Sequence, residues 1–294
     1  MASKLEWRRK MIISGPRIEF REYMYSKRER YAKLAPEEEI EKEIIDEISE
    51  KERGEEPPKD STAIYRAKSE FRRLIFSNAW AYKNNRNKRI PPLFLTLTFT
   101  DNIVDIKKAN REFSKFIQRF NDFLFKSKKM QLKHVTVPQF QERGAVHYHC
   151  VFFNMPYIEK KVYTTIRKIW NRGKFIKLEK VYTAQGIFNY LSRYMMKDFL
   201  DGRLFSKKRY FSSRSLLRPL ILRDDIAIEI LMRQIIPQYT TLKHEGVYPS
   251  DYCGNIEFKN FELKFNVRLE DLELSPYVRK QLEDLVSNQK TIAL

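Results

Sequence analysis

LKHVTVPQFQ-ERG-AVHYHCVFF, residues 132–153, specifies the central fold of this chain most clearly. Two runs rich in apolar and β-branched residues flank the short polar link ERG, in which Gly144 can form a tight turn. This arrangement predicts a β-hairpin with strands at 132–141 and 145–153. In the second strand His147 and His149 flank Tyr148, and the two-residue period of a strand places both imidazoles on one face.

The segments around this hairpin alternate between strand and helix patterns. FLTLTFTD at 94–101 alternates Phe or Leu with Thr, which predicts a strand, and apolar residues recur every three or four positions across 105–126, which predicts a helix. After the hairpin we expect a helix near 158–171, a strand at 175–182 and a helix near 185–200. The resulting order, βαββαβα, favours an α+β fold in which helices cover one side of an antiparallel sheet.

The N-terminal part of the chain has a different pattern. Residues 1–35 are basic and show no clear period, whereas 36–54 predict an amphipathic acidic helix that ends near Gly54. A further helix is expected at about 62–85. The N-terminal extension is therefore predicted to be helical.

The C-terminal part predicts a mixture of helices and strands. Beyond residue 224 we expect a helix to about 236, strands near 239–248 and 255–265, and a helix near 269–287. The predicted domains are an N-terminal extension at 1–60, a central domain at 61–222 and a C-terminal α/β extension at 223–294.

The charge distribution points to a polyanionic partner. The chain of 294 residues has a formal net charge of +19. Residues 37–60 contain 12 acidic and 4 basic residues, so the remaining chain holds 53 basic against 26 acidic residues, a net +27. A protein this basic most often binds nucleic acid.

Several classes of protein are disfavoured by the sequence. Two cysteines, Cys150 and Cys253, are too few for a disulfide scaffold and indicate a reducing compartment. No apolar run reaches the roughly 18 residues of a membrane span, and the N-terminus lacks the features of a secretory signal. We therefore expect a cytoplasmic protein, in the host cell if it is viral. No GxxxxGK[ST] motif is present, so no P-loop motor is expected.

The two strand histidines are candidate metal ligands. Two neutral imidazoles on one strand face can bind a divalent ion and leave room for further ligands. Across the hairpin Gln139 and Gln141 share a face, so either amide oxygen could be the third ligand, and Glu142 at the turn is another alternative. The competing interpretation is a pair of hydrogen-bonded structural histidines. His134 and His244 have no comparable context and are expected to be structural or solvent-facing.

The segment YLSRYMMK, residues 190–197, is a candidate for nucleophilic chemistry. On a helix Tyr190, Arg193, Tyr194 and Lys197 would share one surface, because residues three and four apart are neighbours. Nearby cations favour the phenolate, which attacks phosphorus. The alternative is a helix whose tyrosines pack on the sheet and whose cations are solvated.

A third basic segment, KKRYFSSRSLLR at 207–218, could contact nucleic acid. Its Lys, Arg and Ser side chains could bind phosphates, and Tyr210 or Phe211 could stack on a base. An ordinary basic loop is the alternative. The candidate DNA-binding residues are Arg143, Lys207, Lys208, Arg209, Tyr210, Ser213 and Arg214.

Taken together, these motifs resemble the rolling-circle replication initiators of the HUH endonuclease type, especially those of small single-stranded DNA phages and related plasmids. The resemblance runs from about residue 65 to 220. FLTLTFTD resembles the first motif of that family, His147-Tyr148-His149 its metal motif, and the segment from Tyr190 to Tyr194 its two-tyrosine motif, with Arg193 in place of lysine.

The resemblance implies a fold and a reaction. The fold is a five-stranded antiparallel sheet with the histidines on a central strand and the tyrosine helix beside them. Mg²⁺ or Mn²⁺ would polarise the scissile phosphate, and Tyr190 would attack it, retaining the 5′-phosphate and releasing a 3′-OH for a polymerase. Tyr194 would serve the second strand transfer, which rejoins the strand. Relatives often have a glutamate ligand where this chain has Gln139.

The resemblance also implies partners. The substrate would be single-stranded or supercoiled origin DNA, and a separate helicase and a DNA polymerase would act with the protein. A plasmid relaxase or a single-strand transposase would use the same chemistry. A non-enzymatic basic nucleic-acid-binding protein would explain the charge but not the paired motifs.

Overall fold

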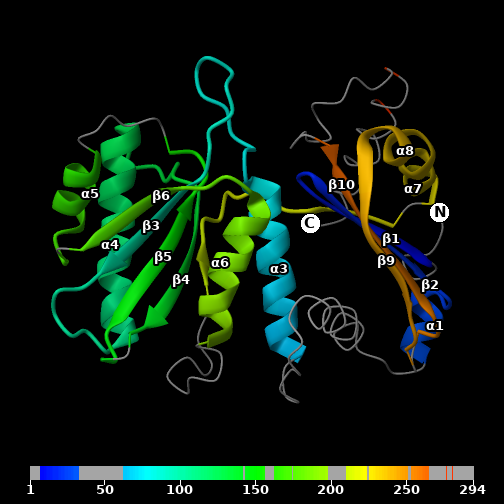
Figure 1. The fold of residues 1–294 in the computed structure, drawn as a ribbon, viewed down its shortest axis with the longest axis horizontal. Helices are drawn as coiled ribbons and strands as arrows, with labels where there is room; N and C mark the ends of the chain where they lie inside the picture. The colour runs from blue at the N-terminus through cyan, green and yellow to red at the C-terminus, as the bar shows by residue number, and fades with distance from the viewer. Residues whose placement is uncertain are drawn as a thin grey trace. The chain divides into compact units, whose positions relative to one another are not determined.

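The protein is described by a computed structural model (Figure 1). The described residues are 7–32, 62–141, 143–155, 162–173, 175–197, 210–223, 225–250, 253–264 and the single positions 276 and 280. The acidic helix predicted at 36–54 lies outside them, as does nearly all of the helix predicted at 269–287. Among the described residues, no helix is both long and apolar enough to cross a lipid bilayer.

The chain divides into two compact units, and each contains one five-stranded sheet. Unit 1 combines residues 1–77 with 218–294, and unit 2 is the continuous segment 78–217. Both terminal regions therefore belong to one unit. The domain boundaries predicted from the sequence, at 60/61 and 222/223, differ from this division chiefly because residues 62–77 group with the terminal segments.

Unit 2 contains the α+β fold expected from the sequence. Its sheet has the strand order β6-β3-β5-β4-β7, and every neighbouring pair is antiparallel. The strand with the two histidines, β5, is the middle strand of the five. The elements are β3 (Leu93–Thr98), α4 (Ile106–Phe125), β4 (His134–Phe140), β5 (Val146–Phe152), α5 (Val162–Trp170), β6 (Ile176–Lys180), α6 (Ala184–Lys197) and β7 (Phe211–Ser212).

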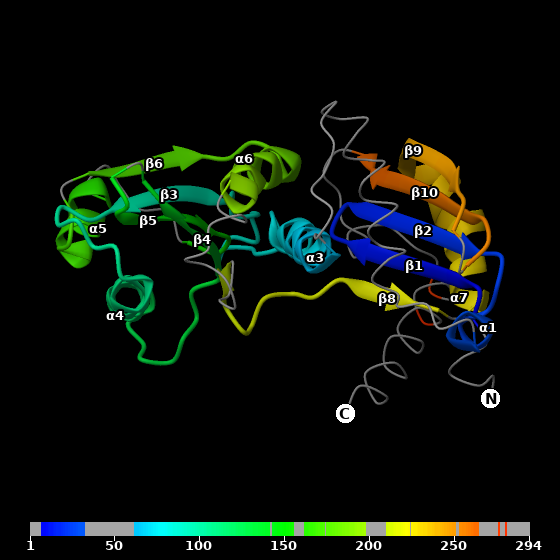
Figure 2. The same cartoon turned by 90° about the horizontal axis from the view of Figure 1, so that it is seen from below.

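Helices cover both faces of this sheet, which corrects the expectation of helices on one side (Figure 2). On one face Leu97, Tyr148 and Cys150 pack in a core with apolar side chains of α4 and α5, among them Phe116 and Trp170. Helix α6 packs on β4, and its side chains contact residues of the opposite face. The order of elements along the chain does not determine the face on which each helix lies, so the sequence could not separate α6 from the other two.

Local signals fix the bounds of the hairpin and of α4. Gly144 has a φ of 84°, a conformation that favours glycine, and the Gln141 N–H donates to the Ala145 carbonyl at 2.8 Å. The carboxylate of Asp105 caps α4 by accepting from the Lys107 N–H at 2.8 Å. The resulting strand register pairs Gln139 with His147.

Unit 1 has a sheet with the order β8-β1-β2-β10-β9, again antiparallel at every pair. An apolar core lies between this sheet and the helices near residue 230, and Ile18, Phe20 and Leu231 belong to it. The elements are β1 (Arg9–Ser14), β2 (Arg17–Tyr23), α1 (Lys27–Ala32), α3 (Thr62–Asn78, grouped with unit 1 up to residue 77), β8 (Leu220–Leu222), α7 (Asp225–Ile230), the π-helix η2 (Leu231–Ile235), α8 (Ile236–Tyr239), β9 (Thr240–Tyr248) and β10 (Ile256–Leu263).

The hairpin of β1 and β2 corrects the prediction of a helical N-terminal extension without a clear period. Gly15, with a φ of 57°, lies at the turn between the two strands. In β2, Ile18 and Phe20 face the apolar core, whereas Glu19 and Arg21 are buried on the other face. Charged residues on a buried face conceal the usual alternation of apolar and polar residues.

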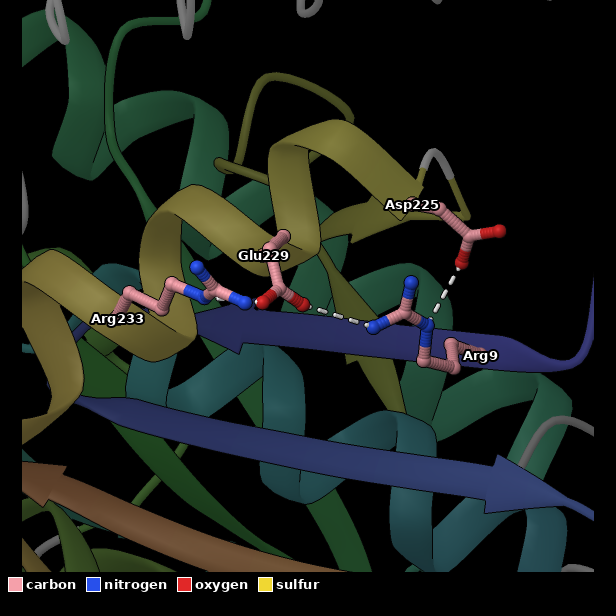
Figure 3. A network of polar contacts seen from close by, with 4 residues as sticks. All are labelled: Arg9, Asp225, Glu229 and Arg233. Carbon is pink, nitrogen blue, oxygen red and sulfur yellow. Dashed lines mark hydrogen bonds and ion pairs between the residues drawn. The ribbon is translucent and has the colours of Figure 1, made fainter.

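A polar network joins β1 to the helices of unit 1 (Figure 3). The Arg9 side chain donates to Asp225 Oδ1 at 2.8 Å and to Glu229 Oε2 at 3.1 Å. Arg233 pairs with the same glutamate. Hydrogen bonding to the two carboxylates raises the pKa of Arg9 against the opposing effect of its burial. All four side chains have partners within the network, so its role is structural.

Candidate metal centre

Three potential ligand atoms converge on one face of the unit 2 sheet. His147 Nε2 lies 2.7 Å from Gln139 Oε1 and 2.8 Å from His149 Nε2, and His149 Nε2 lies 3.0 Å from Gln139 Oε1. The strand pairing explains this triangle, because Gln139 stands opposite His147 and the histidines are two residues apart. Gln139 and His149 are buried and His147 is partly buried.

The size of this triangle fits a divalent cation. Nitrogen and oxygen ligands lie roughly 2.0–2.2 Å from such an ion, so two ligands at right angles are separated by about 3 Å. The three edges of the triangle, 2.7, 2.8 and 3.0 Å, are close to that separation. Gln139, His147 and His149 could therefore occupy one face of an octahedron, with the opposite positions left for water or substrate oxygens.

Burial keeps both imidazoles in the form that binds metals. Desolvation lowers the pKa of His147 to about 4. Desolvation, with a further contribution from His147, lowers the pKa of His149 to about 3. At neutral pH both rings are therefore uncharged, and an uncharged imidazole has a nitrogen lone pair for a metal.

Two residues of β3 hold the ring of His149 in place. The Thr96 hydroxyl lies 3.3 Å from His149 Nδ1, the ring nitrogen that does not point into the triangle. Phe94 stacks on the same ring, with centroids 5.8 Å apart. Such outer contacts orient a metal ligand. The sequence predicted only a strand at 94–101, and the alternating threonines were the one available signal for this role.

Of the two candidate third ligands that the structure describes, Gln139 and Gln141, only Gln139 lies at the histidines. Gln139 belongs to the triangle, whereas the Gln141 side chain accepts from Arg143 Nε at 3.0 Å beside the turn. Glu142 lies outside the described residues. The part of the chain that the structure describes contains no group of three His, Cys, Asp or Glu side chains placed to bind a metal ion, so the site depends on an amide oxygen.

Helix α6 brings Tyr190 to the same face of the sheet. The Tyr190 ring contacts Phe94 edge-on, with centroids 4.6 Å apart, and lies 6.1 Å from the ring of His149. It is partly exposed. Arg193, Tyr194 and Lys197 belong to α6 by their backbone, and their side chains lie outside the described set.

The other predicted DNA contacts have varied surroundings. Arg143 is exposed and donates to the Phe99 carbonyl at 2.9 Å, and Arg214 is exposed in a turn. Tyr210 is partly buried. Ser213 is buried; its hydroxyl donates to the Leu132 carbonyl and accepts from the His134 N–H, so the structure gives it a structural role in place of the predicted phosphate contact. Lys207, Lys208 and Arg209 lie outside the described residues.

The two remaining histidines are not part of this site. His134 is buried against Phe113 and Phe152, and its Nδ1 lies 3.0 Å from the Thr136 hydroxyl. Burial lowers its pKa to about 4. His244 contacts the Tyr248 hydroxyl in unit 1. The sequence favoured a structural or solvent-facing position for both, and the contacts of each are structural.

One comparison with known proteins identifies the segment that contains this site. Residues 92–199 match a family of replication-associated proteins, the ORF2 type. The match spans β3 to α6 and therefore includes Gln139, both histidines of the triangle and Tyr190. It is consistent with the resemblance to a rolling-circle replication initiator. No curated protein and no solved structure matches the chain.

Proposed function

We propose that this protein initiates rolling-circle DNA replication by cutting one strand through a tyrosine nucleophile at a divalent metal ion. The observation that carries the proposal is the position of Tyr190 beside His149, on the face where His147, His149 and Gln139 converge. The match of residues 92–199 to the replication-associated ORF2 family supports the role in replication.

The proposed reaction is a transesterification. The phenolic oxygen of Tyr190 attacks the scissile phosphorus and forms a new O–P bond, and the bond from phosphorus to the 3′ oxygen breaks. The phenol loses its proton and the departing 3′ oxygen gains one, so no cofactor is consumed. The product is a 5′-phosphotyrosine link and a free 3′-OH. A bound ion would act as a Lewis acid on a phosphate oxygen.

The chain's own residues have distinct roles in this proposal. His147, His149 and Gln139 would hold the ion, Mg²⁺ or Mn²⁺, and Thr96 and Phe94 orient the ring of His149. Tyr194 is proposed to act in the second transfer, which rejoins the strand, and Arg193 and Lys197 to favour the phenolate and bind phosphate. A five-stranded sheet with both histidines on its central strand and Gln139 on the neighbouring strand supports assigning unit 2 to the HUH endonuclease type.

The other interpretations differ in what they leave unexplained. A relaxase or single-strand transposase would share the chemistry, but the family match is to replication-associated proteins. A non-enzymatic basic nucleic-acid-binding protein would account for the charge, yet it gives no reason for a tyrosine ring next to a triangle of buried ligand atoms. DNA is the substrate in the lead proposal, with a separate helicase and polymerase as partners.

Trapping of a covalent protein–DNA adduct tests the proposal. Labelled single-stranded oligonucleotides bearing candidate origin sequences are incubated with the full chain and Mn²⁺, and denaturing gels show any DNA attached to protein. We expect Tyr190→Phe and Tyr194→Phe each to reduce strand transfer and the double variant to abolish it. Exposed Tyr182, just before α6, provides the matched control, and Tyr182→Phe should retain the adduct. Adducts that persist in the double variant would reject both tyrosines as nucleophiles.

A further inference from the structure

A short basic hairpin precedes β3 in unit 2. Residues 82–90, here called the basic finger, include six consecutive exposed positions from 83 to 88 (Figure 1). The backbones of Lys83 and Arg89 form an antiparallel β-bridge across the hairpin, so the finger is a narrow two-stranded ribbon. It lies outside the segment that matches the replication-associated family, and the proposed reaction does not use it.

The finger is held in shape by its own hydrogen bonds. The Asn84 side chain accepts from the N–H groups of Arg86 and Lys88 at 3.0 and 2.9 Å, and the Asn84 N–H donates to the Lys88 carbonyl at 2.8 Å. At the base, the Ile90 N–H donates to the Tyr82 carbonyl at 2.8 Å. The exposed tip is therefore ordered without burying apolar surface.

Trp80, two residues before the finger, has an unfavourable backbone conformation, with a φ of 55°. Asn87 within the finger also has a positive φ, 57°, which asparagine adopts more readily than most residues. A left-handed backbone is rare for a bulky residue such as tryptophan and costs on the order of 1–3 kcal/mol. Arg89 holds the turn at Trp80 by donating to its carbonyl at 2.6 Å. Strained residues cluster at functional segments, which makes the neighbouring finger a candidate for one.

Three cations in the exposed part of the finger have no acidic partner among the described side chains. Lys83, Arg86 and Lys88 are exposed, and none of them forms an ion pair with an acidic side chain of the described residues. Three cations on a rigid ribbon form a preorganised surface for a polyanion. The major groove of B-form DNA is wide enough to admit a two-stranded β-ribbon, and phosphates line both of its edges.

We propose that the basic finger binds double-stranded DNA next to the cleavage site, with its ribbon in the major groove and Lys83, Arg86 and Lys88 on or near the phosphates. This inference rests on the proposed function only in taking DNA as the substrate, and it is independent of the metal and the tyrosines. The finger leads into the start of β3 and α6 follows the end of β6, and these two ends lie side by side, since the strands are antiparallel neighbours and the Pro92 carbonyl accepts from the Val181 N–H.

A salt titration of DNA binding tests the finger. The triple variant Lys83→Ala, Arg86→Ala, Lys88→Ala is compared with Lys107→Ala, Lys108→Ala, Arg111→Ala, which removes two lysines and one arginine from exposed positions of α4. Affinity for a labelled duplex is measured by fluorescence anisotropy at several salt concentrations in the presence of EDTA. The finger variant should lose roughly one unit of log–log salt slope per phosphate contact, up to about 3, whereas the α4 variant should stay near the unmodified protein.

The same proteins are titrated with a single-stranded oligonucleotide of the same length. The proposal is supported if the finger variant loses affinity and salt slope on the duplex but little of either on the single strand. Equal losses on both substrates, or an unchanged slope on duplex, would overturn it. Adduct formation on a short single strand separates this outcome from the proposed function: the finger variant should retain the adduct, and the double variant Tyr190→Phe, Tyr194→Phe should lose it while keeping the full salt slope.

Discussion

The central strands of the two sheets both bury polar side chains, but with opposite consequences. In unit 2, β5 buries His149 and half-buries His147 as uncharged rings whose nitrogens converge on the amide oxygen of Gln139. In unit 1, β2 buries Glu19 as a charged group and surrounds it with cations. The two clusters differ in whether their oxygen and nitrogen atoms can bind a metal ion.

The cluster around Glu19 is closed. Arg73 donates to both carboxylate oxygens, at 2.9 and 3.4 Å, and Arg72 and Arg21 lie 3.5 and 3.6 Å away. Burial alone would raise the pKa of Glu19, but Arg73, Arg72 and Arg21 together lower it far below its usual range. A carboxylate already paired with guanidinium groups is not available as a ligand for a metal ion, and its loss would leave buried positive charge uncompensated.

The triangle in unit 2 is open by contrast. Each of its three atoms can present a lone pair to an ion, because both imidazoles are uncharged and Gln139 contributes an amide oxygen. A buried polar cluster is therefore a candidate metal site when its convergent atoms are uncharged lone-pair donors, and not when its carboxylate is already paired with guanidinium groups. Burial by itself does not distinguish the two cases.

Removing the carboxylate charge of Glu19 should have the largest effect, a loss of stability. Glu19→Gln removes the charge that three arginines share, and breaking a buried ion pair in this way costs about 3–5 kcal/mol. The free energy of unfolding, measured by denaturant titration, should fall by that amount. The matched control is Glu22→Gln, an exposed glutamate on the same strand, which should change stability by less than about 0.5 kcal/mol.

The pH dependence of stability gives a second measure of the same cluster. Because the pKa of Glu19 is lower in the folded than in the unfolded state, its stabilisation is complete above the unfolded pKa and is lost as the pH falls toward the folded pKa. The free energy of unfolding, measured at a series of acidic pH values, should therefore fall less steeply with decreasing pH in Glu19→Gln than in the unmodified protein. Glu22→Gln should keep the original slope, and equal slopes in all three proteins would contradict the role assigned to Glu19.

A charge added to the open cluster should strengthen its binding of a metal ion. Gln139→Glu places a carboxylate where the amide oxygen lies, and a charged oxygen binds a hard cation better than a neutral one. Mn²⁺ affinity, measured by calorimetric titration, should rise by at least about tenfold, the lower end of the changes that the surroundings of a metal ligand produce. Gln141→Glu, whose side chain lies beside Arg143, is the control and should give a much smaller change.

The weakest effect concerns the orientation of His149. Thr96→Val keeps the shape of the side chain and removes the hydroxyl near Nδ1, so Mn²⁺ affinity should fall by up to about tenfold. Thr98→Val removes a hydroxyl that donates to the Phe175 carbonyl and serves as the control. If both variants bind Mn²⁺ equally well, Thr96 does not orient the ring.

Much of unit 2 could be predicted from the sequence because its signals are local. The apolar period of α4, the threonines of β3 and the glycine turn of the hairpin each specify one element. The strand spacing of His147 and His149 correctly put them on one face. The contact between Gln139 and both rings needed the register of the hairpin, and the sequence left Gln141 and Glu142 as alternatives.

Other features of the fold depend on contacts between residues far apart in the chain, and the sequence alone could not predict them. The β1–β2 hairpin escaped prediction because Glu19 and Arg21 are buried on a face where Glu19 meets partners on α3, more than 50 residues away. The face on which α6 lies, and therefore the contact of Tyr190 with Phe94, also follows from tertiary packing. The role of Thr96 requires the pairing of β3 with β5.

Whether the triangle is a metal centre can be measured by titrating the full chain with Mn²⁺ and following the free ion by electron paramagnetic resonance. The unmodified protein should bind one ion in a site that His147→Ala and His149→Ala each abolish, while His134→Ala leaves that site intact. Binding that is absent from the unmodified protein, or that is unaffected by the loss of both His147 and His149, would contradict the assignment.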